Sequence, residues 1–389
     1  MNYSIIVPVF NRPDEVDELL ESLCAQTLKD FEVIIVEDGS QKPCKDVCDK
    51  YADILDLHYY LKPNSGPGQS RNYGAERARG EWLIVLDSDV VLPEDYLAHV
   101  DERLEIRDER YDNSQSGHST ERCNHISHLS PLISHLAAWG GPDAAHPDFT
   151  PVQKAISYSM TSFFTTGGIR GSSSPKGGMK GALDKFFPRS FNMGIRRDVY
   201  LQLGGFSKMR FGEDIDFSYR IVEAGYTPRL FPDAWVWHKR RTDFRKFFRQ
   251  VYNSGIARIN LEKRHPGTLK LVHLLPTVFT VGVIVCLLCW LVGEGLFCYG
   301  LLQSPDVPKS LMTTGLWMSV LTLSPLVLYS LLIFVDSSLK NKSLRVGLLS
   351  VPAAFTQLMG YGLGFIESWW KRCVLKQDEF TAFEKNFYK

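Results

Sequence analysis

The chain has 389 residues, with 44 Lys and Arg balanced by 44 Asp and Glu, so its formal net charge is zero. Apolar residues make up 44% and aromatic residues 12%, which excludes a disordered protein and allows roughly two or three domains. The charge is not evenly spread, because residues 1–237 carry net −10, residues 238–270 net +8 and residues 271–389 net +2. We therefore expect differently charged regions rather than one neutral soluble body.

Residues 1–106 alternate short apolar runs with amphipathic stretches. Apolar runs that predict strands are found at residues 5–9, 33–36, 57–61 and 83–86. Helices are predicted around residues 16–23 and 69–79. Strands that are apolar on both faces are typical of a parallel sheet covered by helices on each side. The pattern predicts an α/β domain with a Rossmann-like βαβ array.

Two irregular stretches interrupt or follow this array. Residues 107–135 hold four of the ten histidines, and Cys123, His125 and His128 could form part of a zinc site. A solvated insertion is the interpretation that we favour for this stretch. Residues 165–181 carry six glycines and predict either a mobile loop or a lid over a substrate.

A basic amphipathic segment begins near residue 243. Within residues 243–262, apolar side chains recur at helical spacing and basic side chains occupy the other side. This pattern favours a helix in the lipid headgroup layer, and a packing helix of the soluble domain is the alternative. The α/β domain would then be residues 1–242, with a juxtamembrane segment over residues 243–270.

Three uncharged apolar runs follow, at residues 272–293, 311–335 and 346–366. Each reaches the roughly 20 residues that cross about 30 Å of hydrocarbon. The third run contains Pro352, Gln357 and three glycines, and could instead be re-entrant or interfacial. The pair Cys286 and Cys289 has zinc-like spacing, but membrane-buried thiols are the favoured interpretation.

Basic residues beside the spans predict an inner-membrane, multi-pass protein whose soluble domain is cytosolic. The loop at residues 336–345 fits this side if two spans precede it. The basic tail, residues 371–389, also looks cytosolic, which three full spans would forbid. Either the third run does not cross the membrane or the tail breaks the charge rule.

Polar residues follow three predicted strands. Asp87-Ser88-Asp89 comes after the last strand, Glu37-Asp38 ends the second, and Asn11 follows the first. In an open α/β sheet, ligands bind at the carboxyl ends of the strands. Two carboxylates one residue apart can hold Mg²⁺ or Mn²⁺ and leave positions for phosphate oxygens.

Five ordered blocks over residues 1–240 resemble family 2 glycosyltransferases of the GT-A fold. The blocks are residues 4–12, Val36-Glu37-Asp38-Gly39-Ser40, residues 64–72, Asp87-Ser88-Asp89 and Gly212-Glu213-Asp214-Ile215-Asp216. The resemblance implies that Pro8, Asn11, Glu37 and Asp38 contact the base and ribose of a nucleotide. It places Arg71 near the diphosphate, and Asp87 and Asp89 at the sugar and metal.

The later acidic block implies a catalytic base. A sugar hydroxyl is a poor nucleophile at neutral pH, so a carboxylate must take its proton. Asp214 is the first choice for this base and Glu213 the second. Both lie near the start of a predicted helix, so either acid could instead cap the helix amides. His238 could complete the metal shell, as a histidine does in some related enzymes, or could be a structural imidazole.

These features predict a metal-dependent inverting glycosyltransferase that moves one sugar from a nucleotide-sugar, with UDP favoured. The acceptor would be a lipid-linked glycan or glycolipid hydroxyl in cell-envelope glycan synthesis, and no nucleic acid partner is expected. The Gln-x-x-Arg-Trp block of processive members has no counterpart before the apolar runs, which favours single addition. The alternatives are a polyprenyl-phosphate acceptor, a sugar nucleotidyltransferase, and a non-enzymatic membrane scaffold.

Overall fold

The computed structural model describes residues 2–115, 136–146, 148–166, 186–209, 211–302 and 309–378. The described residues form two compact units. The first contains residues 2–146, apart from the gaps, together with 186–239, and the second contains 148–166 together with 240–378. Each unit is described by itself.

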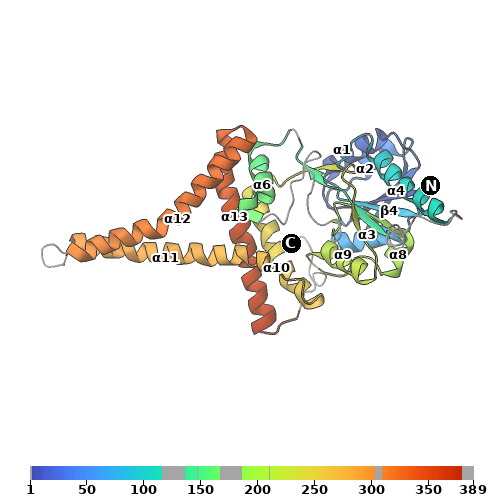
Figure 1. Cartoon of the computed structure of the whole chain (residues 1–389). Coiled ribbons are helices and arrows are strands. Elements are labelled where there is room, and N and C mark those ends of the chain that lie inside the picture. Colours follow the sequence, from blue (N-terminus) through green and yellow to red (C-terminus); the bar gives the residue numbers. More distant parts are fainter. Residues whose placement is uncertain are drawn as a thin grey trace, which may run out of the picture. The chain divides into compact units, whose positions relative to one another are not determined.

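A seven-stranded sheet forms the centre of the first unit, in the order β3-β2-β1-β4-β8-β6-β9 (Figure 1). Its strands are β1 (Tyr3–Val9), β2 (Phe31–Asp38), β3 (Asp56–Lys62), β4 (Trp82–Leu86), β6 (Ala138–Gly140), β8 (Asn192–Arg196) and β9 (Arg229–Leu230). Within the described sheet, β8 runs antiparallel to β4 and β6, and the other neighbouring pairs are parallel. The predicted mostly parallel α/β fold is confirmed.

Helices cover both faces of this sheet, as predicted. One face carries α1 (Pro13–Cys24), α2 (Lys45–Tyr51) and α4 (Tyr96–Gln115), and the other carries α3 (Pro67–Ala75), α8 (Arg197–Gln202) and α9 (Glu213–Glu223) (Figure 1). Successive side chains of a strand point to opposite faces, so Ile5 joins the first core cluster and Ile6 the second. Both side chains are fully buried, which explains why the strands are apolar at successive positions.

Two glycines allow close approach inside this unit. A Cβ atom on Gly74 of α3 would lie 2.6 Å from Cγ2 of Ile6, so α3 sits directly on β1. A Cβ atom on Gly194 of β8 would lie 2.0 Å from the indole of Trp139 in β6. A bulky aromatic therefore occupies the space above a strand residue that has no side chain.

A second, three-stranded sheet was not predicted. It consists of β5 (Val90–Val91), β10 (Val236–His238) and β7 (Asp143–Ala144), in the order β5-β10-β7. Strands of two or three residues are too short to show a period in the sequence. This sheet matters for function because His238 ends β10 and Asp143 begins β7.

Several local predictions agree with the structure, and others shift. The strand over 57–61 is β3, and the helix predicted over 69–79 ends earlier, at Ala75. Helix α4 continues to Gln115, into the stretch interpreted as an insertion. The zinc candidates Cys123, His125 and His128, and the glycine-rich residues 167–181, lie outside the described residues.

The second unit is helical. Its helices are α6 (Pro151–Thr161), α7 (Phe163–Thr166), α10 (Phe244–Arg264), η2 (Leu271–His273), α11 (Leu275–Leu302), α12 (Lys309–Asn341), α13 (Leu344–Trp369) and the π-helical turn η3 (Trp370–Val374). Three helical stretches are long and apolar enough to cross a membrane: Leu271–Leu302, Ser310–Asn341 and Leu344–Val374. They contain the three predicted apolar runs. Cys286 and Cys289 both lie in α11 as free thiols.

The apolar face of α10 is covered by protein. Phe247 and Val251 pack with Ile156 and Met160 of α6, and all four side chains are buried. A lipid headgroup layer was the expected neighbour of this face. This apolar face instead packs against protein of the C-terminal unit, while Arg245, Lys246 and Arg249 of the same helix remain exposed.

The boundary between the units also differs from the predicted one after residue 242. The second unit begins at Arg240 and includes α6 and α7 from an earlier part of the chain. Helix α6 starts with a capping box, in which Gln153 N donates to Thr150 Oγ1 at 3.3 Å and Thr150 N donates to Gln153 Oε1 at 3.0 Å. Its packing against distant helices is a tertiary property that its local sequence does not show.

Candidate active site

The carboxyl ends of β1, β2 and β4 meet at one edge of the main sheet. Strand β1 lies between β2 and β4, because the chain adds β2 and β3 on one side of β1 and then adds β4 on its other side. Ligands of open α/β sheets bind at such a switch point. Asp38 ends β2, Asp87 follows β4 and Asn11 follows β1. The predicted convergence of polar strand ends is therefore present in the structure.

Asp87, Asp89 and His238 form a cluster at this edge. Each offers a ligand atom within 4.8 Å of the others. Nε2 of His238 lies 3.3 Å from Oδ1 of Asp89, and Nδ1 lies 4.0 Å from Oδ2 of Asp143. The ring stacks on Phe191 with centroids 5.0 Å apart, which fixes its orientation. The three predicted metal ligands thus come together from the loop after β4 and the end of β10. At 4.0 Å, the carboxylate of Asp143 is too far from Nδ1 of His238 for a hydrogen bond.

Two arginines contact the carboxylates of this cluster. Arg12 donates to Asp89. Arg71 is only 3% exposed, and its Nη2 donates to Oδ1 of Asp87 at 2.6 Å, while its Nη1 lies 3.3 Å from Oε1 of Glu213. A buried guanidinium requires partners, and two carboxylates supply them. Arg71 therefore connects the predicted metal site to the predicted base region.

The acidic pair at the start of α9 is divided between two environments. Gly212, with φ 83°, turns the chain into the helix that begins at Glu213. Burial and the neighbouring charge of Asp214 raise the pKa of Glu213 to about 7, against the attraction of Arg71. Oδ2 of Asp214 lies 3.3 Å from Nε of Arg189. Its Oδ1 accepts the N–H of the next residue at 2.9 Å, so Asp214 also contacts a first-turn amide, as the capping alternative proposed.

The acids at the end of β2 are buried and bound by neighbouring loops. Oε2 of Glu37 accepts the backbone N–H of Cys44 at 2.7 Å. The carboxylate of Asp38 accepts the N–H groups of Ser65 and Gly66 at 2.9 and 2.8 Å. Both acids therefore bind the two loops that flank this part of the sheet. A nucleoside bound to either carboxylate would have to share it with a loop amide.

Asn11 and Pro8 come from the first strand and its turn. Asn11 has φ 55°, a left-handed conformation that Asn tolerates better than most residues. Its Oδ1 accepts the N–H groups of Gln41 and Lys42 at 2.7 and 2.9 Å, and its own N–H donates to Oγ of Ser40 at 2.7 Å. Pro8 is half-buried near the end of β1. Asn11 therefore joins the first strand end to the loop after β2.

The comparisons with known proteins agree with this geometry. The family model "Glycosyl transferase family 2" matches residues 4–119. The chain contains a family 2 glycosyltransferase domain. The matched residues include the polar ends of β1, β2 and β4, and the acids of α9 and His238 lie beyond them.

Curated relatives carry glycosyltransferase names. An uncharacterized glycosyltransferase of Haemophilus influenzae is 42% identical over 93 residues, which is 22% of this chain and 29% of that protein. The pre-mycofactocin glycosyltransferase of Mycobacterium tuberculosis is 25% identical over 304 residues, covering 75% of this chain and 53% of the relative. The chain thus spans about half the length of one relative and under a third of the other.

A solved structure shares the fold. The mannosyltransferase PcManGT from Pyrobaculum calidifontis, in complex with GDP-Man and Mn²⁺, has a TM-score of 0.50 at 14% identity. The match covers 95% of this chain and 88% of that one. At this identity the similarity shows the fold of the glycosyltransferase domain and nothing more.

Four residues of this site were not predicted as site residues: Arg12, Asp143, Arg189 and Phe191. Arg12 had a signal, since it stands beside Asn11 in the first block of the family resemblance. Phe191 begins the block Phe191-Asn192-Met193-Gly194, which resembles the acceptor-side region of the same family, but its position beside His238 was not predicted. Asp143 and Arg189 come from a short strand and a turn that no motif marks. Their roles follow from contacts with His238 and Asp214.

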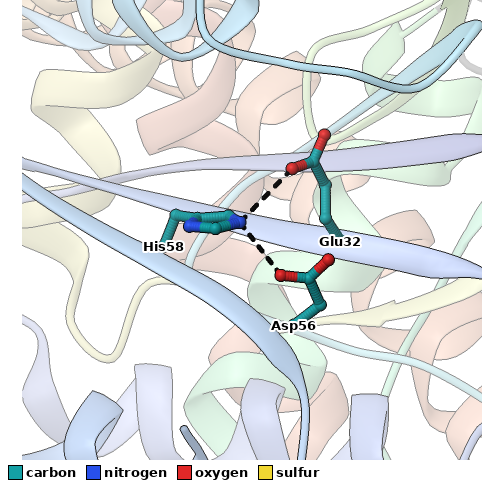
Figure 2. Close-up of side chains that lie close together, drawn as sticks. All are labelled: Glu32, Asp56 and His58. Atoms are coloured by element: carbon teal, nitrogen blue, oxygen red, sulfur yellow. Dashed lines mark ion pairs between the residues drawn. The ribbon is translucent and has the colours of Figure 1, made fainter. Parts of the chain in front are cut away.

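A second group of metal-type ligands lies at the opposite edge of the sheet. Glu32, Asp56 and His58 approach one another near the starts of β2 and β3, with Nε2 of His58 3.0 Å from Asp56 and 3.5 Å from Glu32 (Figure 2). Nη2 of Arg79 lies 2.7 Å from Asp56, 2.8 Å from Glu32 and 2.9 Å from His58. A protein cation already serves these groups, so we interpret the cluster as an ion-pair network.

Proposed function

We propose that the chain is a metal-dependent, inverting glycosyltransferase that transfers one sugar from a nucleotide-sugar to a membrane-associated acceptor. One observation carries the proposal: Asp87, Asp89 and His238 converge beside Arg71 at the ligand-binding edge of a family 2 glycosyltransferase domain. Inversion is supported by the family resemblance alone. The candidate membrane spans support a membrane-associated acceptor. The basic residues beside the spans support the proposed inner-membrane location with the catalytic domain in the cytosol.

The ligand set favours Mn²⁺ over Mg²⁺. Two carboxylates and an imidazole lie within reach of one ion, and Mg²⁺ prefers oxygen ligands while imidazole suits transition metals. When bound, such an ion stabilises negative charge on the departing diphosphate. The Mn²⁺ named for the Pyrobaculum structure is in accord with this choice.

Arg71 and Arg12 hold the carboxylates that would bind the ion. Arg71 contacts Asp87, and Arg12 contacts Asp89. Their positive charge also favours a diphosphate at this edge. We propose that Arg71 acts mainly by positioning, because its guanidinium is buried between Asp87 and Glu213.

Asp214 is the proposed base, and Glu213 is the alternative. Asp214 pairs with Arg189, whose side chain is 37% exposed, so an acceptor hydroxyl could reach this acid by displacing an exposed partner. Glu213 has a pKa suited to proton transfer at neutral pH, but Arg71 holds its carboxylate. Loss of transfer in Asp214→Asn, with substantial activity retained in Glu213→Gln, is the expected result. Near-normal transfer by Asp214→Asn would contradict this assignment.

The donor and acceptor are also proposals. UDP is the favoured nucleotide, and GDP is the alternative that the Pyrobaculum complex suggests. The proposed acceptor is the hydroxyl of a lipid-linked glycan or glycolipid, with polyprenyl phosphate as an alternative that would need no base. The mycobacterial relative is named for pre-mycofactocin, so acceptors outside the lipid fraction belong in the assay as well.

The decisive experiment incubates the purified full chain with UDP- and GDP-sugars, Mn²⁺ or Mg²⁺, and membrane lipid extract. We expect release of a nucleoside diphosphate and sugar in a lipid fraction. Asp87→Asn and Asp89→Asn should abolish transfer, whereas Asp56→Asn, from the ion-pair network at the other edge of the sheet, should retain it. Release of pyrophosphate would indicate a nucleotidyltransferase, and full function of an Asp87→Ala, Asp89→Ala double variant would indicate a non-enzymatic scaffold.

A further inference from the structure

Helices α10 and α13 lie side by side and run in the same direction. Oγ of Ser368 donates to the carbonyl oxygen of Ile256 at 3.2 Å. Four residues further along, in the turn η3 that continues α13, Nε of Arg372 donates to Oδ1 of Asn260 of α10 at 3.1 Å. In both pairs the partners are 112 residues apart in sequence, so the two helices run parallel with a constant offset of 112 residues.

Glycines bring the two backbones into direct contact. A Cβ atom on Gly364 of α13 would lie 2.1 Å from the carbonyl oxygen of Tyr252, which is also 112 residues away in sequence. A Cβ atom on Gly255 of α10 would lie 2.1 Å from the carbonyl oxygen of Tyr361. No side chain separates the helices at these points. Whatever surrounds this part of α13 therefore also surrounds α10.

Helix α10 is unsuited to a hydrocarbon environment. Arg245, Lys246 and Arg249 are exposed near its start, and Lys263 and Arg264 are exposed at its end. With the same offset of 112 residues, the first three lie beside residues 357–361, in the middle of the apolar run 346–366. If α13 crossed the bilayer along this run, three exposed cations would be held near the bilayer centre, where charged side chains are strongly unfavourable.

The first half of α13 is flanked by a second helix that cannot span. Ala155 of α6 packs with Val346 and Ala353, and Tyr158 packs with Ala354. Helix α6 has 11 residues, which rise only about 16 Å against about 30 Å of hydrocarbon. Helix α13 is thus accompanied over most of its length by helices that do not cross a membrane.

Helices α11 and α12 have the opposite character. They form a hairpin in which Gly293 and Gly315 allow close contact. In each, 11% of the most apolar window is buried, against 44% in the third candidate span. Figure 1 shows the hairpin extending away from α13, while α13 runs across its base. A hairpin that crosses the bilayer would leave α13 along the membrane surface.

We propose that, of the described helices, α11 and α12 alone cross the bilayer, and that α6, α10 and α13 form a platform in the lipid headgroup layer. The partner of this platform is the lipid headgroup surface on the cytosolic side. Lys340, Lys342 and Arg345 then lie on the same side as Lys371 and Arg372, which removes the conflict between the basic tail and three full spans. The proposal does not depend on the proposed glycosyl transfer.

Single-cysteine labelling of the full chain in intact cells and in inside-out membrane vesicles tests the topology. The native Cys373 reports on the segment after α13, Lys342→Cys on the α12–α13 junction, and Ser310→Cys on the start of α12. We expect a membrane-impermeant maleimide to label positions 342 and 373 from one side and position 310 from the other. Labelling of Cys373 from the side of position 310 would overturn the proposal.

A reporter fused after residue 389 of the unmodified chain gives the same answer if the cysteine-substituted protein does not fold. A fluorescent protein that matures only in the cytosol should be fluorescent there. An alkaline phosphatase fusion, active only outside the cytosol, should be inactive. The opposite pair of results would show three spans.

Depth measurements distinguish a surface helix from a spanning one. A bimane label at Leu348 and one at Trp370 are 22 residues apart, or about 33 Å along a straight helix. Quenching by nitroxide lipids should place both labels at the same shallow depth. A label at Leu328 of α12, which is 65% exposed, should lie deeper and serves as the control. Labels at 348 and 370 in opposite leaflets would refute the platform.

Discussion

Glu213→Gln should change the pH dependence of stability. The pKa of Glu213 is raised from its ordinary value of 4.5 to about 7, first by burial and then by Asp214. A raised pKa means that the folded state holds the proton more tightly than the unfolded state does. The contribution of the protonated carboxyl to folding stability is therefore complete below pH 4.5 and is lost as the pH rises through 7. The ionised carboxylate therefore costs about 3 kcal/mol at pH 8, at about 1.4 kcal/mol for each pH unit. Glutamine stays neutral and avoids this cost.

The expected result is a change with pH in the difference in unfolding free energy between Glu213→Gln and the unsubstituted chain. Between pH 4 and pH 8, Glu213→Gln should gain about 3 kcal/mol of unfolding free energy relative to the unsubstituted chain, whatever constant effect the amide has. Pulse proteolysis in urea, on the full chain in detergent without metal or donor, measures the fraction of folded catalytic unit. With an m-value of about 1–3 kcal/mol per molar, the urea midpoints should diverge by about 1–3 M.

Glu32 is a matched control, because its pKa is shifted in the opposite direction. Burial acts to raise the pKa of Glu32, but hydrogen bonds from Ser4 and Arg79 outweigh it and hold the pKa below its ordinary value. Its contribution to stability is present above the ordinary pKa and is lost as the pH falls. Glu32→Gln should therefore lose more stability at pH 8 than at pH 3. If the Glu213→Gln and unsubstituted curves run parallel from pH 4 to 8, the assigned pKa of Glu213 is wrong.

Three further substitutions test packing and binding. Gly194→Ala should destabilise the catalytic unit by about 1–3 kcal/mol, measured by urea denaturation, because its Cβ would overlap the indole of Trp139. Unchanged stability would mean that the indole moves freely. Arg71→Met should raise the KM for the nucleotide-sugar at least tenfold in a transfer assay, because Asp87 loses its charged partner; an unchanged KM would refute the positioning role. Gly364→Leu should lower the melting temperature in detergent by separating α10 from α13, whereas Gly295→Leu, with open space around its Cβ position, should not. Equal effects of the two would contradict the close contact.

Much of the glycosyltransferase domain could be predicted from local sequence. Strand β2 and its neighbours are apolar on both faces because helices cover both faces of the sheet, and this requirement is visible residue by residue. Asp87 and Asp89 were identifiable because carboxylates directly after a buried strand need a partner. His238 was a weaker prediction, since the residues beside its ring, Asp143 and Phe191, are distant from it in the chain.

The C-terminal region shows where local patterns stop being informative. The amphipathic pattern of α10 is equally compatible with a lipid surface and with a protein partner, because both bury an apolar stripe. The three glycines of α13 looked like weaknesses in a membrane span. In the structure, Gly360 and Gly364 face α10 and Gly362 faces α11, so they are the points of helix contact.

The sequence alone determined strands β1 to β4, helices α1 and α3, the family resemblance, the acids at the strand ends and the three apolar runs. These follow from short-range periodicity and from blocks of adjacent residues. The tertiary structure decided which acids face Arg71, what positions His238, and which helices cover α10 and α13. Most of these pairings join chain segments that lie far apart in sequence, such as Arg71 and Glu213 or α10 and α13. The free energy that selects them comes from packing and charge neutralisation, which no local pattern contains.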